Sequence, residues 1–529
     1  MRSVSHALRF HLLLIVFGTG MGSASPADYA EWRKLSPERQ RELTPALEAK
    51  AFRKLPSKER QEISEAAVRF SADAIGRKPN GKLKFVRDET EKRLLRIAGE
   101  YLNKLPADKV PPHPRAADLF GRIPEGAQRV SRSLSIDPST DRWHSTGLYA
   151  APGEVVKVDV PASWIGKGIK VRLSGHIDNI PQTKDMARLP SPVSRVFEIK
   201  ETSTNVASAF GGAIYIDMGK KPIKAPPFEV QISNALIAPT FKLGTTTAEE
   251  WRETQRRAPA PYAELICSRV AFSVPSEWVR DLDDPSELMR YWDRVVELHD
   301  QLGGMSHLRS YRERVNVDVQ ISLGLFHSGY PMQGPQDHCR KMVDLAGLRE
   351  QGNWGWFHEL GHEAQRRPDR AWGYNNPYTF DNSVEVTVNL FSSHAYDKLR
   401  ITPKGGWAWT VNPELVAAMA RKAIDAKTPY AEAKVGTRLA MYLQLRDAFG
   451  WEAIQAVLKS YSDDECANPE KLPKSDQSKR DEFFVRMSRA VNRDLSPFMQ
   501  KLWGIEISEE AKKLVSDLKP WTPEGFPAS

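Results

Sequence analysis

Two histidines separated by three residues, in the stretch His358-Glu-Leu-Gly-His362, constrain this chain more than any other feature. Residues four apart on an α-helix lie on one face, so both imidazoles can reach a single metal ion without distorting the backbone. Glu359 directly follows the first histidine and can accept a proton from water beside that ion. The stretch predicts a helix that carries a zinc site and a general base. The structural alternative is a buried helix whose histidines hydrogen-bond to carbonyl groups.

Zinc in a hydrolytic site needs a third protein ligand, which we predict to be Glu385. Residues 381–391, Asp-Asn-Ser-Val-Glu-Val-Thr-Val-Asn-Leu-Phe, can form a helix capped by Asn382 that places Glu385 and Asn389 on one face. Asn389 would then hydrogen-bond the far side of a histidine ligand and fix its ring. The apolar residues of this segment also alternate with a period of two, which fits a strand equally well.

Three other carboxylates compete for the position of third ligand: Glu363, Asp369 and Asp381. Glu363 adjoins the second histidine and would point away from the metal, and Asp369 lies in a basic turn that contains a proline. A metzincin site is excluded, because the chain has Gln365 and Pro368 where that class needs glycine and histidine.

The motifs around this stretch resemble a known family. Trp354-Gly-Trp-Phe-His-Glu-Leu-Gly-His362, followed after 22 residues by Glu-Val-Thr-Val-Asn389, looks like the enhancin-like, mucin-targeting zinc metallopeptidases of metallopeptidase family sixty. Thr146-Gly-Leu-Tyr149, His327-Ser-Gly-Tyr-Pro331 and Phe498-Met-Gln-Lys-Leu-Trp-Gly504 are similar to that family as well. The resemblance covers residues 119–510, and its specificity lies in the combination and order of the motifs.

The resemblance implies an endopeptidase that hydrolyses peptide bonds in O-glycosylated, mucin-like glycoproteins, with the sugar often part of what is recognised. It makes His358, His362 and Glu385 the ligands of one Zn²⁺ and Glu359 the general base. Two alternatives stay open: a peptidase of cell-envelope substrates, and a glycan or cell-surface binding protein with the same fold and no turnover. The complete ligand set favours an enzyme, because a binding protein has no need of a general base.

Peptide hydrolysis also requires a donor for the oxyanion that forms on the substrate carbonyl, a role that gluzincins give to a tyrosine or histidine. The candidates are Tyr330, His327, Tyr374 and Tyr378, each of which can instead be a packed or rim residue. The aromatic residues that precede the first histidine are expected to pack its helix against a core.

Residues 1–24 predict a cleavable signal peptide. Arg2 and Arg9 precede an apolar run at residues 10–17, and Gly22-Ser-Ala24 matches a small-x-small cleavage site. The apolar run is too short for a stable membrane span. The protein is therefore predicted to be secreted or periplasmic, with no stable membrane span after cleavage.

The rest of the chain divides into three regions, which predict a multidomain α+β protein. Residues 25–118, the helical region, have helical spacing interrupted by prolines. Residues 119–245, the β region, contain short alternating runs separated by Pro-Gly and Gly-Gly turns, which predict an antiparallel β-sandwich. Residues 246–529, the C-terminal region, are expected to form a mainly helical gluzincin-type zinc metallopeptidase domain with a small sheet.

Charge and cysteine content narrow the functional classes further. The net charge of +9 is compatible with an anionic target, although the Lys and Arg residues of the chain are dispersed. No motif supports nucleic-acid binding. Cys267, Cys339 and Cys466 are far apart and lack zinc-site spacing, so at most one disulfide can form within the chain, and buried thiols are expected.

Overall fold

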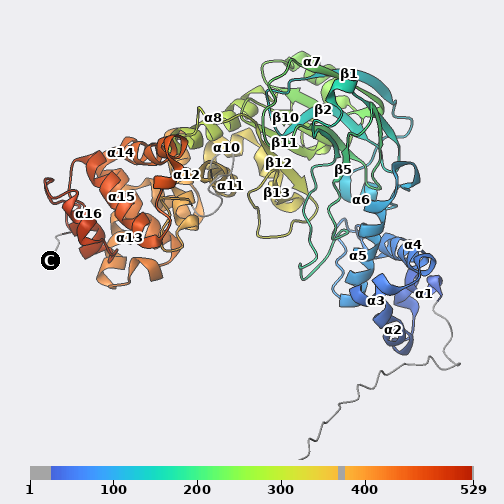
Figure 1. Ribbon diagram of the computed structural model, residues 1–529, viewed down its shortest axis with the longest axis horizontal. Helices are drawn as coiled ribbons and strands as arrows, with labels where there is room; N and C mark the ends of the chain where they lie inside the picture. Colours follow the sequence, from blue (N-terminus) through green and yellow to red (C-terminus); the bar gives the residue numbers. More distant parts are fainter. Residues whose placement is uncertain (1–24, 367–375, 527–529) are drawn as a thin grey trace, which may run out of the picture.

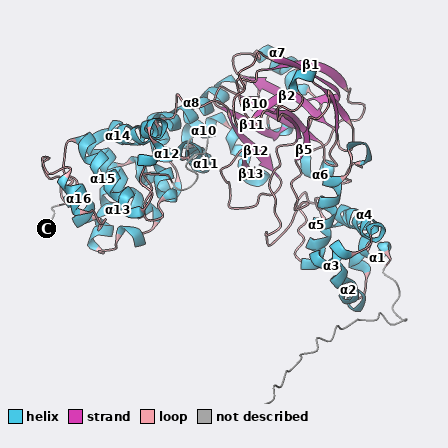
Figure 2. Cartoon of the chain, viewed as in Figure 1, coloured by secondary structure: helices cyan, strands magenta, loops and turns pink. Residues whose placement is uncertain are grey.

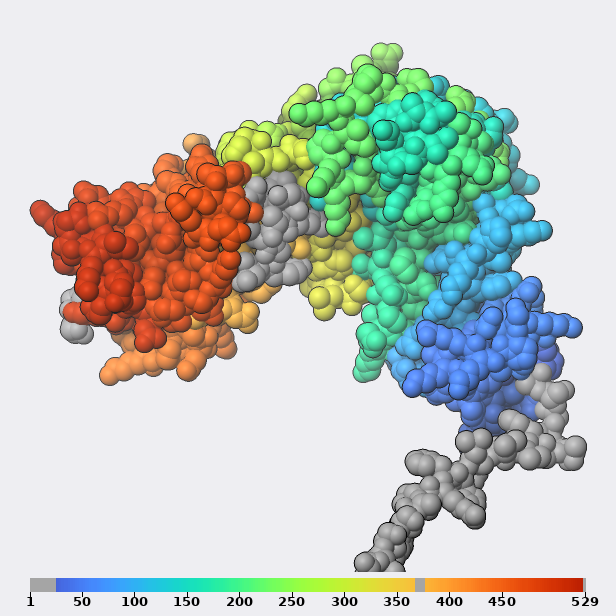
Figure 3. All heavy atoms as spheres, viewed as in Figure 1, coloured from blue at the N-terminus to red at the C-terminus, as the bar shows by residue number. Residues whose placement is uncertain are grey.

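The structure, a computed structural model, describes residues 25–366 and 376–526. These residues form three lobes along an arc: a helical lobe near the amino terminus, a β-rich middle and a helical lobe at the carboxyl end (Figure 1, Figure 2). The space-filling view shows the same lobes, with the inner side of the arc concave (Figure 3). The predicted signal peptide, Asp369 and Tyr374 lie outside the described residues.

Six α-helices form the helical region: α1 (Pro26–Ala30), α2 (Pro37–Leu43), α3 (Ala49–Lys54), α4 (Ser57–Ala74), α5 (Glu89–Lys104) and α6 (Ala116–Phe120). Helix α5 begins after Asp88, whose side chain accepts hydrogen bonds from the backbone N–H groups of Thr90 and Glu91. Its residues Leu94, Leu95 and Leu102 recur at helical spacing and are buried. This apolar stripe packs α5 against α4.

Eight strands make up one sheet in the β region: β1 (Val130–Ile136), β2 (Trp143–Ala150), β3 (Val156–Asp159), β4 (Lys170–Leu173), β5 (Arg195–Glu198), β6 (Ser203–Val206), β7 (Gly212–Asp217) and β8 (Phe228–Ile237). The order is β5-β4-β7-β2-β8-β3-β6, with β1 also on β8, and every pairing is antiparallel.

The predicted sandwich of two separate sheets differs from this arrangement, because β8 is hydrogen-bonded to β1 and β3 and also to β2. Strand β8 thereby joins the two expected sheets. Val158 of β3 pairs with Ile232 of β8, and Tyr149 of β2 pairs with Leu236 farther along the same strand. Strands β3 and β6 lie on one side of β8 in the strand order, and β4 and β7 lie on the other. Side chains from all four strands belong to one buried apolar cluster. The strands therefore enclose a single core while remaining one largely antiparallel sheet.

A second, smaller sheet holds five strands: β9 (Thr240–Lys242), β10 (Tyr262–Ile266), β11 (Val270–Pro275), β12 (Glu313–Asp318) and β13 (Met332–Pro335). Their order is β13-β12-β11-β10-β9, with β10 and β11 antiparallel and the other neighbours parallel. Strands β10, β11 and β12 are buried along their whole length, as expected for strands covered on both faces.

The rest of the C-terminal region is helical: α7 (Ala248–Glu253), α8 (Ser286–Gly303), α9 (Gln336–Cys339), α10 (Leu345–Gln351), α11 (Trp354–Gln365), α12 (Val384–Leu399), α13 (Pro413–Asp425), α14 (Val435–Ala467), α15 (Asp476–Val491) and α16 (Glu509–Lys513). Helix α14 is interrupted at Gly450, whose φ of 80° only glycine adopts at little cost. Helices α11 and α12 contribute to two apolar clusters, one shared with the small sheet and one with the C-terminal helices. Both helices are thus held from two sides.

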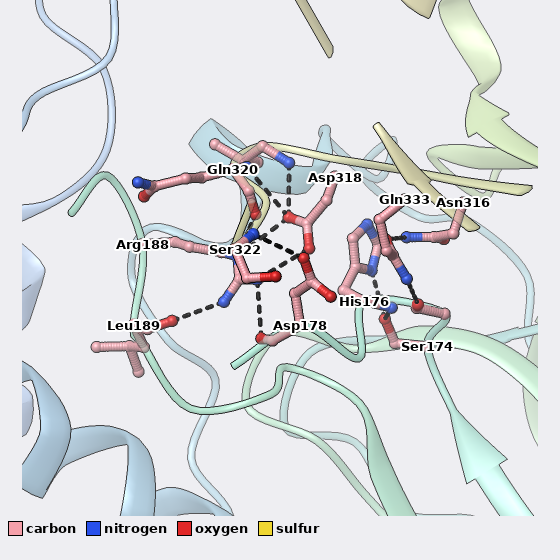
Figure 4. Close-up of polar contacts among 12 residues, drawn as sticks. Ser174, His176, Asp178, Arg188, Leu189, Asn316, Asp318, Gln320, Ser322 and Gln333 are labelled. Carbon is pink, nitrogen blue, oxygen red and sulfur yellow. Dashed lines mark hydrogen bonds and ion pairs between the residues drawn. The ribbon is translucent and has the colours of Figure 1, made fainter. Parts of the chain in front are cut away.

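The β region and the small sheet are joined by a buried ion pair (Figure 4). The guanidinium of Arg188 lies 3.0 Å from the carboxylate of Asp318, at the end of β12, and both side chains are fully buried. Arg188 also donates to the backbone carbonyl groups of Asp178 and Leu189. Because removing one partner would leave a buried charge uncompensated, this pair fixes the loop around Asp178 against β12.

No disulfide joins the three cysteines. Cys267 and Cys339 are buried as predicted, whereas Cys466 is exposed, because it lies near the end of α14 beyond the packed part of that helix. Among the described residues, no helix combines the length and the apolar character that crossing a bilayer requires.

Candidate metal centre

Two histidines of α11 and one glutamate of α12 converge on a single point. His358 Nε2 lies 3.1 Å from one carboxylate oxygen of Glu385, and His362 Nε2 lies 3.4 Å from the other. One potential ligand atom from each residue falls within a group whose members all lie within 4.8 Å of one another, and the described residues hold no other such group. The two predicted histidines and the predicted third residue therefore share one site.

The spacing of these donors suits a tetrahedral ion. With metal–ligand bonds of about 2.0–2.2 Å, the ligand atoms of tetrahedral zinc are separated by about 3.3–3.6 Å, close to the distances between Glu385 and the two imidazoles. Two nitrogens and one carboxylate leave the fourth position open. The side chain of Glu385 is also 59% exposed, so the site is accessible to solvent on that side. The donor set fits a single catalytic divalent metal.

Each histidine is oriented by a side chain on its far nitrogen. His358 Nδ1 lies 2.9 Å from Asn389 Oδ1, at the position predicted for Asn389. His362 Nδ1 lies 3.0 Å from Gln365 Oε1, and the amide of Gln365 donates to Thr387 on α12. Such contacts fix the ring tautomer, so that Nε2 is left to bind a metal.

Close packing of α11 and α12 brings Glu385 within reach. Gly361 lies at their contact, where an added Cβ would come within 3.0 Å of Phe391 and 3.1 Å of Val388. Helix α12 begins at Val384, after Ser383. Asn382, predicted to cap this helix, instead has a left-handed backbone with φ of 57°. Glu385 is consequently in the first turn, which faces α11.

The aromatic residues before His358 pack the metal helix against the core, as predicted. Trp356 and Phe357 are buried, and the ring of Trp354 stacks on Trp407 with their centroids 4.4 Å apart. His299 of α8 hydrogen-bonds to the carbonyl group of Phe357. The backbone that precedes the first histidine is thus fixed on several sides.

Glu359 lies beside the site with its side chain almost completely buried, and none of the described residues hydrogen-bonds to its carboxylate. Its negative charge acts on His358, whose pKa is raised: burial opposes the charged form, but hydrogen bonds to Glu385 and Asn389 and the charge of Glu359 outweigh it. Hydrogen bonds from His358 and His362 hold the pKa of Glu385 well below its usual range. A carboxylate without a fixed partner suits proton transfer.

The rival ligands are engaged elsewhere. Glu363 is buried, forms an ion pair with Arg366 at 2.8 Å and accepts a hydrogen bond from the backbone of Gly329. Asp381 lies 3.7 Å from Arg480. Neither residue belongs to the group of potential ligands.

Two of the four predicted oxyanion donors are in packed surroundings. Tyr330 accepts a hydrogen bond from the backbone N–H of Trp143 and packs edge-on against its ring. Tyr378 is buried, and its hydroxyl group donates to the carbonyl group of Gln365. His327 differs from the two tyrosines in that its side chain is partly exposed, and its ring hydrogen-bonds to Asp178 of the β region.

Sequence reasoning missed Gln365 and Asp178. Gln365 follows His362 by three residues on the same helix, a spacing that could have indicated contact. Asp178 is 149 residues from His327, and no local pattern points to it.

A helix that carries two histidines and a glutamate, with a second glutamate on the following helix, defines a metal site of the gluzincin class. The family described as "Peptidase M60, enhancin and enhancin-like" matches residues 234–504, and the N-terminal domain of M60-like peptidases matches residues 125–233. The chain belongs to this peptidase family, as the motifs predicted.

Vertebrate proteins are among the curated relatives of this chain. TRPM8 channel-associated factor 3 of Rattus norvegicus is 31% identical over 390 residues, which cover 74% of this chain and 41% of the relative. TRPM8 channel-associated factor 2 of Bos taurus is 30% identical over 385 residues, covering 73% and 40%. This chain spans about two fifths of the length of these relatives.

Solved structures share the fold at low sequence identity. A functionally unknown conserved protein from Bacillus anthracis has a TM-score of 0.60 at 18% identity, covering 74% of this chain and 80% of that one. The catalytic module of the metalloprotease ZmpA from Clostridium perfringens has a TM-score of 0.53 at 14% identity, covering 75% and 81%. The IMPa metallopeptidase from Pseudomonas aeruginosa has a TM-score of 0.52 at 15% identity, covering 88% and 63%, and IMPa in complex with T-antigen has a TM-score of 0.54 at 16% identity with the same coverage.

Proposed function

We propose that this chain is an exported zinc endopeptidase that cleaves O-glycosylated, mucin-like glycoproteins. The observation that carries the proposal is the convergence of His358, His362 and Glu385, with Glu359 buried beside them and free of hydrogen bonds to any described residue. The glycoprotein substrate is supported by structures of the same fold that hold T-antigen or an O-glycopeptide. Export is supported by the signal-peptide pattern of residues 1–24.

The residues of the site divide the chemistry between them. A zinc ion held by the two histidines and Glu385 would polarise the scissile carbonyl and lower the pKa of water. Glu359 takes a proton from the water molecule as the water oxygen bonds to the carbonyl carbon. Glu359 then gives that proton to the amide nitrogen as the carbon–nitrogen bond breaks. The products are a carboxylic acid and an amine, and Glu359 is again a carboxylate.

The first prediction concerns Glu359. Glu359→Gln keeps the shape of the side chain but cannot accept the proton, so kcat should fall by about 10²–10⁴-fold while the protein still binds one zinc ion. Turnover of a quenched fluorescent peptide that carries Tn antigen on threonine and elemental analysis of the same sample measure the two properties. Glu350→Gln, at an exposed position on α10, should leave zinc content and turnover unchanged and serves as the matched control. Full activity in Glu359→Gln would refute the assigned role.

The substrate class is tested by offering the zinc-loaded protein intact mucin, deglycosylated mucin and casein. Cleavage of intact mucin in preference to the other two supports a glycan-dependent peptidase. Cleavage of casein and deglycosylated mucin alone would defeat the glycan requirement and favour a peptidase of other substrates, such as cell-envelope proteins.

Binding without turnover is the second candidate function, because the names of the vertebrate relatives describe association with a channel rather than catalysis. Under this alternative, the wild-type protein and Glu359→Gln should retain intact mucin equally and neither should cleave it. Under the peptidase proposal, only Glu359→Gln leaves mucin intact.

A further inference from the structure

A histidine and an aspartate from two regions of the chain meet beside the metal helix. His327 Nε2 lies 2.8 Å from Asp178 Oδ2, and the same carboxylate oxygen accepts the backbone N–H of Ser322 at 2.7 Å. His327 Nδ1 lies 3.0 Å from the carbonyl oxygen of Ser328. Asp178 is almost fully buried, whereas the histidine side chain is 21% exposed. The imidazole therefore has a hydrogen-bond partner at each nitrogen and is partly open to solvent.

The segment around His327 runs along the face of α11 that includes Glu359. Phe326 packs on Trp356 with ring centroids 4.5 Å apart, and the backbone N–H of Gly329 donates to Glu363 at 2.8 Å. Residues 356, 359 and 363 lie on one side of a helix. Since its neighbours contact the two ends of this row, His327 lies opposite the middle of the row, where Glu359 stands.

Asp178 is held rigidly in this position. Its backbone carbonyl group accepts a hydrogen bond from Arg188, the arginine of the buried pair with Asp318 (Figure 4). The backbone of His327 is fixed in turn by two hydrogen bonds of 3.1 Å with the backbone of Gln333, a residue of strand β13 in the small sheet. Neither residue depends on a mobile side chain for its placement.

The surroundings favour charge on both partners. Burial opposes the imidazolium, but hydrogen bonds to Asp178 and to Ser328, with the negative charges of Asp178 and Glu359, raise the pKa of His327. Burial likewise opposes the carboxylate, yet the bond from His327 and those from Ser322 lower the pKa of Asp178. An imidazolium beside the metal site is a charge-assisted hydrogen-bond donor.

We propose that His327 donates a hydrogen bond to the oxyanion that forms on the substrate carbonyl, and that Asp178 of the β region positions it. The inference rests on the proposed peptidase function. Nδ1–H, whose hydrogen-bond partner among the described residues is the carbonyl group of Ser328 in the same loop, is the donor that exchanges this acceptor for the substrate oxyanion, while Nε2–H stays on Asp178. Catalytic hydrogen bonds of this kind tighten when substrate binds. The active site is then composite, with the β region supplying a positioning residue.

The test compares zinc-loaded mature protein with His327→Ala, His327→Gln and Asp178→Asn, using the Tn-antigen peptide described above. Loss of an oxyanion donor lowers kcat by about 10²–10³-fold, so we expect this effect for His327→Ala, with KM within threefold of wild type. Glutamine keeps an uncharged N–H donor, and His327→Gln should retain part of the rate. Asp178→Asn should lower kcat by about 10–100-fold, again with little change in KM.

Two matched variants control for nonspecific loss of folding. His307→Ala removes an exposed histidine. Asp185, on the same loop as Asp178, forms an exposed ion pair with Arg87, which Asp185→Asn breaks. Both should keep wild-type kcat. Zinc content and melting temperature are measured for every variant. If His327→Ala loses zinc, His327→Gln takes its place in the comparison.

The outcomes separate the two proposals. A wild-type protein that binds zinc and cleaves nothing overturns the peptidase proposal, and this inference with it. An active wild type with His327→Ala within threefold of its kcat overturns the role of His327 alone. Equal changes in KM and kcat for Asp178→Asn would reduce Asp178 to a structural residue.

Discussion

At the scale of single residues, the metal centre depends on the side chains behind its ligands. Asn389 accepts from the ring of His358 and donates to the backbone carbonyl group of Glu385, so it orients one ligand and the segment that carries another. Asn389→Ala should weaken zinc affinity by about 10–100-fold. Competition with a chromophoric chelator measures the affinity.

Two further variants sharpen that prediction. Asn389→Asp keeps an acceptor for His358 and should lose less affinity than the alanine variant. Ser393→Ala, one turn along α12, removes a buried hydroxyl group that donates a hydrogen bond to the backbone carbonyl group of Asn389, and should bind zinc like wild type. Equal zinc affinities in all three variants would contradict the assigned role of Asn389.

What the sequence reveals about these residues depends on their separation. The positions of His358 and His362 follow from helical spacing, because four residues make about one turn. Glu385 follows from the family motif, since 22 residues separate it from the second histidine. Asp178 reaches His327 only through the packing of the β region on the small sheet, which leaves no periodic trace in the sequence.

At the scale of elements, the distance between α11 and α12 is set by a residue without a side chain. Gly361→Ala would place its Cβ within 3.0–3.1 Å of Phe391 and Val388, tighter than ordinary contact. The helices would have to separate, at a cost of about 1–3 kcal/mol in the free energy of unfolding, and Glu385 would move from the histidines. Both melting temperature and zinc affinity should fall.

Gly406→Ala is the matched control for this change. An added Cβ at Gly406 meets nothing within 4 Å, so the substitution should leave both quantities as they are. If Gly361→Ala bound zinc as tightly as wild type, close approach of the two helices would not be what positions Glu385.

Helix α12 shows why an element can escape sequence analysis. Its valines alternate with a period of two, so a strand fitted the pattern as well as a helix did. In the structure, residues 386–396 are all buried, because α12 is covered by α8, α11 and α14. A helix that is buried on every side carries no amphipathic signal, and only its surroundings decide.

At the scale of the whole molecule, buried histidines should make stability depend on pH. Burial lowers the pKa of His113, His176 and His299 to about 4 and that of His394 to about 3. Each folded pKa lies below the unfolded value of about 6.5, so the unfolded chain takes up these protons first. Their stabilising contribution is complete above about pH 6.5 and is lost as the pH falls towards 4.

Calorimetric melting of chelator-treated protein at pH 7.5, 6 and 5 measures this dependence without metal release. Each histidine contributes at most about 1.4 kcal/mol per pH unit. His394→Gln should therefore show a shallower fall in melting temperature than wild type, while His307→Gln, at an exposed position, should follow wild type. Parallel curves for wild type and His394→Gln would contradict the prediction.

The global arrangement was only partly predictable. Alternating runs correctly indicated antiparallel strands, and helical spacing indicated the helices on either side of them. Strand β8 bonds to β1 and β3 along one part and to β2 farther on, so that two expected sheets are one. Hydrogen-bonded partners so distant in sequence leave no mark on local alternation.

The buried pair of Arg188 and Asp318 bears on how this protein can be divided. Cutting the chain between the β region and the C-terminal region would leave an arginine without a counterion in one fragment and an aspartate in the other. A fragment that begins after the β region would retain every ligand in its sequence yet carry an uncompensated carboxylate at the end of β12. The smallest piece worth transplanting onto another scaffold is therefore the pair of regions together, because only that piece keeps both charges.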